Sequence, residues 1–290
     1  MKKCVFTGAC TALVTPFLDD KVNYPMLERL LQRQIDAGIE AVVISGTTGE
    51  SATLSDSEKL ELFRRAKDFA GDSCKIIAGT GSNSTEHAIH LSHCAQDIGV
   101  DALLVVSPYY NKATDEGLIA HYSVIAGSVD LPIIIYNVPS RTGLDISISV
   151  YQALSLIPNI IGIKEASSCI VKAAKTISAC PELALYSGND DQIVPVMALG
   201  GMGVISVLSN LFPLETQAIT KAALDGDFDT ASALQLEFLP LIEALFCEVN
   251  PIPVKEAMCY IGYDCGQCRL PLTSLSEEHT IKLKRLLSRF

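Results

Sequence analysis

The sequence predicts a (β/α)8 barrel, an α/β fold, followed by a small C-terminal helical extension. Short apolar runs typical of buried strands recur eight times, and amphipathic segments with helix-start signals lie between them. Near-continuous apolar strands indicate a parallel sheet covered by helices. No G-x-G-x-x-G motif follows the first run, and an open sheet rarely needs eight parallel strands, so a closed barrel is favoured.

The predicted strands are separated by segments that begin with serine or threonine. Ser55, Ser84, Thr114 and Ser167 are the expected helix starts, and only the first has a glutamate three residues later, which makes a capping box. The eight strands are expected at Ala9–Val14, Ala41–Ile44, Lys75–Ala78, Ala102–Val106, Pro132–Tyr136, Ile160–Lys164, Leu183–Ser187 and Gly203–Ser206.

No strand candidate follows Leu224. The remaining periodic segments predict three helices, at Asp227–Ala244, Val254–Ile261 and Ser276–Leu287. We therefore expect residues 1–224 to form the catalytic barrel and residues 225–290 to form a C-terminal helical domain.

Composition excludes several classes of protein. The 290 residues carry a net charge of -11, which argues against electrostatic binding to nucleic acid or to an anionic membrane. The segment Gln192–Leu214 is uncharged, but its glycines and prolines predict helix, turn and strand instead of a membrane span.

The N-terminal residues lack an apolar signal core, so we expect a cytoplasmic protein with reduced cysteines. The pair Cys265 and Cys268 has no second pair or nearby histidine and does not indicate a metal site.

Lys164 is the most informative residue, because it ends the apolar run Ile160–Ile163. Burial of an unpaired ammonium is costly, so a lysine in this place needs a reason. A neutral lysine amine is a nucleophile that forms Schiff bases with carbonyl substrates. Two other interpretations stay open: the side chain reaches out to solvent, or it pairs with Glu165.

Polar side chains follow the other predicted strands, where the functional residues of a barrel gather. The hydroxyls of Thr47 and Thr48, with the backbone N–H groups between Gly46 and Gly49, can hold a small carboxylate. A plain glycine-flanked turn is the alternative. Glu50 is expected to satisfy loop amides and not to act as a base.

Two further side chains of the same rim have possible chemical roles. Tyr136 is a phenol one strand away from Lys164 and can pass protons, or it is an ordinary rim aromatic. Arg141 offers a bidentate fork for a carboxylate, or it is a solvated loop arginine.

Other chemistries lack their motifs in this sequence. The histidines at 87, 90 and 93 have i, i+3, i+6 spacing and predict a solvated helix face instead of an H-E-x-x-H zinc site. Neither a G-x-S-x-G elbow nor a Walker loop occurs, which argues against a serine hydrolase and a kinase.

Taken together, five motifs resemble the dihydrodipicolinate synthase family of pyruvate-dependent Schiff-base aldolases and lyases. The resemblance covers essentially the whole chain, and Thr47, Tyr110 and Arg141 are the features more specific to the synthase. The motifs are Gly46–Glu50, Tyr109-Tyr110, Tyr136–Gly143, Lys164-Glu165 and Asn250–Lys255.

The resemblance implies a reaction and a role for each residue. Lys164 would form an imine with pyruvate, and the derived enamine would attack L-aspartate 4-semialdehyde. Tyr136 is similar to the proton donor and acceptor, and Thr47 and Tyr110 to its relay, with Tyr110 supplied by a neighbouring subunit. The substrate-binding positions would be Thr48, Arg141, Gly188 and Ile205. No metal or organic cofactor is implied, and a homo-oligomer, usually a tetramer, is.

One departure from the family concerns feedback inhibition by lysine. Lysine-inhibited members bind the amino acid with Ser, Ala, two His, Asn, Glu and Tyr. The chain matches at Ser51, Ala52, Asn83 and Tyr109, but it has Asp56 and Lys59 for the histidines and His87 for the glutamate. Because a carboxylate is lost and a cation is gained, we expect weak or absent inhibition by lysine.

Two rival functions are considered. Other lyases of the superfamily, such as N-acetylneuraminate lyase or 2-keto-3-deoxy sugar acid aldolases, share Lys164 and Tyr136 but commonly lack an arginine at position 141. A barrel that only binds a keto acid is the second rival, and a lysine, tyrosine and threonine on one rim argue against it.

Overall fold

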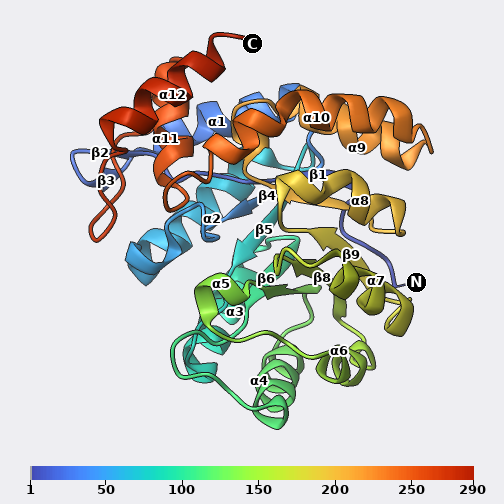
Figure 1. The fold of residues 1–290 in the computed structure, drawn as a ribbon. Helices are drawn as coiled ribbons and strands as arrows, with labels where there is room; N and C mark the ends of the chain where they lie inside the picture. Colours follow the sequence, from blue (N-terminus) through green and yellow to red (C-terminus); the bar gives the residue numbers. More distant parts are fainter. Residues whose placement is uncertain (1) are drawn as a thin grey trace.

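Eight parallel strands close into a barrel in the order β1, β10, β9, β8, β7, β6, β5, β4, and β4 pairs again with β1. The computed structural model describes residues 2–290 and confirms the predicted (β/α)8 fold (Figure 1). Every strand lies within two residues of its predicted bounds. The barrel strands are β1 (Gly8–Ala12), β4 (Ala41–Ile44), β5 (Lys75–Gly79), β6 (Ala102–Val106), β7 (Ile133–Asn137), β8 (Ile160–Glu165), β9 (Ala184–Ser187) and β10 (Gly203–Ser206).

Helices surround the barrel, with three short 3-10 turns near the strand ends. The helices are α1 (Tyr24–Asp36), α2 (Asp56–Ala70), α3 (Thr85–Ile98), α4 (Asp115–Ser128), α5 (Pro139–Thr142), α6 (Ile148–Ser155), α7 (Ile170–Ala179), α8 (Ile193–Ala198), α9 (Pro213–Leu224), α10 (Phe228–Ala244), α11 (Ile252–Tyr260) and α12 (Glu277–Leu287). The 3-10 turns are η1 (Ser51–Thr53), η2 (Asp190–Gln192) and η3 (Leu208–Asn210).

Three of the four predicted helix starts are confirmed. The Ser55 hydroxyl and the Glu58 side chain form the reciprocal capping box at α2, and Ser84 and Thr114 each accept a backbone N–H in the first turn of α3 and α4. The predicted helix start at Ser167 is wrong. Helix α7 begins at Ile170, and the preceding residue Cys169 forms no side-chain cap. The Ser167 backbone N–H donates instead to the Glu165 carboxylate at 2.8 Å.

A short hairpin after the first barrel strand was not predicted. It pairs β2 (Phe17–Leu18) with β3 (Lys21–Val22) through Asp19 and Asp20, whose φ angles of 50° and 60° are left-handed. Aspartate tolerates this conformation, which two-residue hairpin turns need. Two-residue strands are too short to produce a hydrophobic period, so the pattern could not reveal them.

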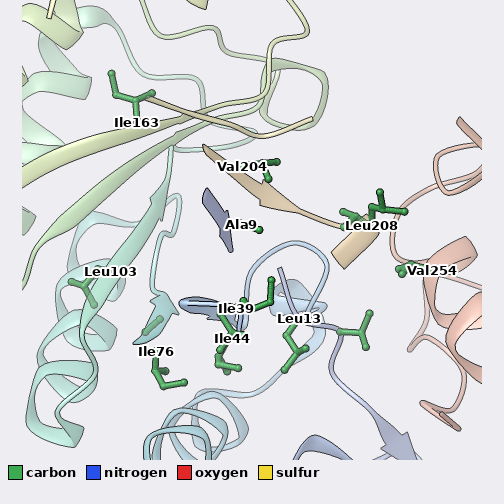
Figure 2. Close-up of a cluster of buried hydrophobic side chains, with 14 of the residues drawn as sticks. Ala9, Leu13, Ile39, Ile44, Ile76, Leu103, Ile163, Val204, Leu208 and Val254 are labelled. Carbon is green, nitrogen blue, oxygen red and sulfur yellow. The ribbon is translucent and has the colours of Figure 1, made fainter. Parts of the chain in front are cut away.

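The apolar core has two parts, one inside the barrel and one between the barrel and its helices. The outer part, shown in Figure 2, includes Ile76, Leu103 and Ile163 from the strands and Val254 from α11. The inner part includes Cys10, Ile134 and Ile205 and lies below the catalytic rim. Because strand residues alternate between the two faces, a rim side chain is directed by its position along the strand.

The three C-terminal helices follow the turn after α9 and continue the helical layer, as the orange and red segments of Figure 1 show. Helix α10 packs against α8, α9 and α12, and α11 packs against α12 and η3. Their existence confirms the predicted helices, while the division at residue 224 into two domains stays a prediction. Within residues 2–290, no helix is both long and apolar enough to cross a membrane.

Candidate active site

Lys164 and Tyr136 lie directly opposite each other on the neighbouring strands β8 and β7. The Lys164 Nζ atom is 4.3 Å from the centroid of the Tyr136 ring, and each residue is 6% exposed. Among residues 2–290, no carboxylate lies within ion-pair distance of this Nζ atom. The alternative in which Lys164 pairs with Glu165 is therefore wrong, because the cation next to Glu165 is Lys172, at 4.0 Å.

The loop after β4 brings its two threonines to different places. Thr47 is half-buried and lines a cavity of about 510 Å³ above the barrel. Thr48 is buried behind the cavity wall, and its Oγ1 atom accepts a hydrogen bond from the Asn250 amide at 3.0 Å. The Thr48 hydroxyl is therefore held by the C-terminal segment, while the Thr47 backbone carbonyl accepts the Glu50 N–H within its own loop at 3.1 Å.

Glu50 ends this loop and has a structural position. Its carboxylate accepts hydrogen bonds from Lys255 Nζ and from the Arg269 backbone N–H, both at 2.9 Å. Glu50 therefore satisfies one loop amide, as expected, but that amide belongs to Arg269 in the C-terminal part of the chain. Glu50 has a left-handed φ of 57° and also lines the cavity.

Arg141 lies on α5 and lines the same cavity as Thr47 and Tyr136. Its guanidinium donates to the Asn250 carbonyl oxygen at 3.0 Å and is otherwise exposed. One Asn250 residue thus contacts both Thr48 and Arg141, through its amide and its carbonyl. The alternative of a solvated loop arginine stays open, because Arg141 is exposed and only its Nη2 atom is held.

Gly188 and Ile205 lie at the ends of β9 and β10. The Gly188 N–H donates to the Glu165 carbonyl at 2.8 Å, and a Cβ atom added there would lie 2.6 Å from the Cβ atom of Ala166. Only glycine permits this close approach of two strand ends. Ile205 is fully buried in the inner core. Neither residue lines the 510 Å³ cavity, and Lys164 borders it only through Tyr136.

Tyr110 is the predicted site residue that the chain leaves most exposed. Its side chain is 90% exposed and its backbone has a left-handed φ of 73°. Its neighbour Tyr109 is 37% exposed and lines the cavity. An isolated chain therefore brings Lys164, Tyr136, Thr47 and Arg141 to one rim, and Tyr110 faces away from it.

Two polar residues near the site received no role from the sequence. Asn250 bridges two elements far away in sequence, so only its place in the Asn-Pro motif could have drawn attention to it. Asp190 is buried, and its carboxylate accepts the backbone N–H groups of Val207 and Leu208 at 2.9 Å. Burial raises the Asp190 pKa, and these hydrogen bonds oppose the rise. Its position directly after the seventh strand was the available signal.

A barrel with a buried, unpaired lysine beside a tyrosine at the strand ends defines an enzyme of the Schiff-base-forming lyase class. The chain belongs to the Dihydrodipicolinate synthetase family, which matches residues 5–290.

Individual proteins agree with this assignment. The 4-hydroxy-tetrahydrodipicolinate synthase of Caldicellulosiruptor saccharolyticus is 49% identical over 98% of this chain and 96% of the relative. Among solved structures, the chloride-inhibited dihydrodipicolinate synthase from Acinetobacter baumannii complexed with pyruvate is 42% identical, with a TM-score of 0.95 over 97% of this chain and 98% of that one. The Cyanidioschyzon merolae enzyme with lysine bound is 40% identical, with a TM-score of 0.95 over 99% and 98%.

Proposed function

We propose that this enzyme condenses pyruvate with L-aspartate 4-semialdehyde to give 4-hydroxy-tetrahydrodipicolinate, in diaminopimelate and lysine biosynthesis. The observation that carries the proposal is the unpaired Lys164 amine, 4.3 Å from the ring centroid of Tyr136, which lines a cavity together with Arg141. The Acinetobacter relative, whose structure is described as complexed with pyruvate, supports the first substrate. The family relatives named as synthases support the second.

The chemistry begins when the Lys164 amine adds to the pyruvate carbonyl carbon. Loss of water gives an imine, and loss of a methyl proton gives an enamine. The enamine carbon attacks the aldehyde, and the substrate amine then displaces Lys164 by transimination and closes the ring. The imine is itself the electron sink, so the steps need no group beyond the chain and its substrates.

Tyr136 is proposed to move protons to and from the carbinolamine and imine, because its phenol is beside the lysine. Thr47 and Tyr110 of the partner subunit would relay the protons onward. Thr48 and Ile205 would hold pyruvate, Gly188 would line the pocket, and Arg141 would hold the semialdehyde carboxylate. The cytoplasm is the proposed location, in keeping with ten free thiols, of which Cys169 is exposed.

A homotetramer built from dimers is part of the same proposal. Tyr110 is 90% exposed in a left-handed backbone conformation, which is costly for a tyrosine with no contact to hold it. A second copy of the chain would cover this phenol and direct it into the neighbouring site. Sedimentation should give a dimer or tetramer, and Tyr110→Phe should lower kcat without changing that state. A fully active monomer would contradict this part of the proposal.

Turnover separates the proposal from the rival lyases. The enzyme should consume pyruvate with L-aspartate 4-semialdehyde in an assay coupled to reduction of the product, and it should not cleave sialic or 2-keto-3-deoxy sugar acids. Cleavage of those acids without activity on the semialdehyde would assign the chain to another lyase of the superfamily. Arg141→Ala should raise the KM for the semialdehyde more than the KM for pyruvate, because only the former loses its carboxylate partner.

Weak or absent inhibition by lysine is also proposed. His87 Nε2 lies 2.9 Å from the Asp56 carboxylate, and Lys59 Nζ lies 3.7 Å from it, so this carboxylate is already engaged. The Lys59 ammonium lines the same cavity and would repel a cationic ligand. The Cyanidioschyzon relative binds lysine in its structure. Half-inhibition of this enzyme below 1 mM lysine would contradict the proposal, and the combined change Lys59→His and His87→Glu should increase sensitivity.

A further inference from the structure

Glu165 follows Lys164 on β8 and is buried on the opposite face of the barrel wall, between the strands and the helices. Its carboxylate accepts the Asn137 amide at 2.9 and 3.2 Å, the Tyr151 hydroxyl at 3.1 Å and the Ser167 backbone N–H at 2.8 Å. A buried carboxylate with three different donors is held in one orientation. The reaction steps above give this group no role.

The principal partner of Glu165 occupies the corresponding position on the next strand. Asn137 follows Tyr136 on β7, and it lies directly opposite Glu165 in the strand register. Tyr136 lies opposite Lys164 in the same register. Successive strand residues point to opposite faces of the barrel wall. The hydrogen bond between Asn137 and Glu165 therefore joins β7 and β8 on the outer face, next to the position where Tyr136 and Lys164 meet on the inner face.

The other contacts of this cluster extend to the loops that leave the two strands. Asn137 Oδ1 accepts the Ile146 backbone N–H at 3.2 Å, beyond the loop that carries Arg141. Ser167 belongs to the loop after Lys164. Burial and the nearby Glu165 carboxylate raise the pKa of Tyr151, so its hydroxyl stays a donor. Lys172 donates to the Ile146 carbonyl and lies 4.0 Å from Glu165 as a counter-charge.

We propose that Glu165 is a positioning residue for the Schiff-base reaction, acting through Asn137 to fix the spacing of Lys164 and Tyr136. The inference rests on the proposed function. Proton transfer between the phenol and a carbinolamine depends on that spacing, and small displacements of reacting groups are costly in rate. A carboxylate is needed because every group around it is a donor. An amide in its place would direct an N–H group at another donor.

The test is the rate at which borohydride traps pyruvate on the enzyme at saturating pyruvate. Glu165→Gln should slow trapping about tenfold or more, with a smaller change in the half-saturating pyruvate concentration. Asp145→Asn is the matched control, because it changes a carboxylate that contacts Asn137 and Lys172 but leaves the hydrogen bond between Glu165 and Asn137 in place. It should trap pyruvate at the wild-type rate.

A double-mutant cycle separates positioning from general support of the fold. In a Tyr136→Phe background, Glu165→Gln should slow trapping less than twofold, because there is no phenol left to position. Equal loss in both backgrounds would overturn the inference, as would wild-type trapping by Glu165→Gln itself. If Glu165→Gln does not fold, Asn137→Ser removes the same link and should show the same dependence on Tyr136.

Failure of the inference is distinguishable from failure of the proposed function. If wild-type protein takes no label from pyruvate, the proposed function fails and the cycle has no signal to divide. If wild-type and Glu165→Gln proteins are labelled equally fast on Lys164, the function stands and the positioning role of Glu165 is wrong.

Discussion

Lys164 and Lys255 are both buried, at 6% and 2% exposure, and each has its ammonium above an aromatic ring. Lys255 also has two polar partners: Glu50 at 2.9 Å and the Gln267 carbonyl at 3.0 Å. Lys164 has no ion pair within residues 2–290, and its neighbour Tyr136 lines a cavity. Burial alone therefore does not identify a reactive lysine. The lack of an ion-pair partner and the nearby cavity identify it.

Lys255 also stabilises a loop of the candidate active site. Glu50, which Lys255 holds, ends the loop that carries Thr47 to the rim near Lys164. Asn250 and Arg269 add hydrogen bonds from the C-terminal region to Thr48 and Glu50. The C-terminal helices and their connections therefore stabilise the barrel loop on which the proposed substrate contacts depend.

The largest expected effect is that of Lys164→Met. Removing the nucleophile should lower turnover by roughly a thousandfold or more. Thermal stability should stay unchanged or rise, because an unpaired buried ammonium is replaced by an apolar chain. Coupled-assay rates and a melting curve check both halves. A variant with substantial activity would show that Lys164 and Lys255 do not differ in the way described.

Lys255→Met should have the opposite profile. It leaves the Glu50 carboxylate buried without its cation, which costs about 3–5 kcal/mol in the free energy of unfolding. Urea denaturation measures this loss. The double change Glu50→Gln with Lys255→Met should recover part of the stability, because no uncompensated charge remains. If Lys255→Met alone were as stable as wild type, the buried pair would have no structural role.

A third buried base, His121, shows another outcome of burial. Burial lowers its pKa from 6.5 to about 4, and Thr85 contacts its Nδ1 atom at 2.9 Å. The His121 side chain binds a proton at higher pH in the unfolded chain than in the folded protein. The stability that neutral His121 contributes is therefore present above about pH 6.5 and is lost as the pH falls toward 4. Between pH 7 and 5 the loss should be about 2 kcal/mol.

The control for this prediction is His121→Phe, which keeps a buried ring without a titratable group. Its free energy of unfolding should fall less between pH 7 and 5 than that of wild type. Identical pH dependence of the two proteins would show that His121 does not resist protonation in the fold.

The smallest expected effect belongs to Asn250→Ala. Loss of the amide donor to Thr48 should weaken pyruvate binding by about 1 kcal/mol, or roughly fivefold in KM. Arg141 keeps its contact with the backbone carbonyl of residue 250, so the KM for the semialdehyde should change less. Steady-state kinetics with each substrate varied in turn tests the difference. A larger effect on the semialdehyde would reverse the assigned roles.

Strands and rim positions could be predicted because they depend on local pattern. Apolar runs located all eight strands, and Lys164 and Tyr136 came to the rim because both end such runs. The hairpin at Asp19-Asp20, the bridge made by Asn250 and the pairing of Glu50 with Lys255 depend on contacts between distant segments. The hydrophobic period of a single segment does not predict such contacts. The exposed position of Tyr110 could not be predicted for a related reason, since any residue that contacts its side chain would come from another chain.

The central claim is that Lys164, and not another buried lysine, forms the imine with pyruvate. Borohydride reduction in the presence of pyruvate, followed by peptide mass mapping, tests it directly. The expected result is one reduced pyruvate per chain on the peptide that contains Lys164, with the Lys255 and Lys59 peptides unmodified. Label on either of those lysines, or no label at all, would contradict the account.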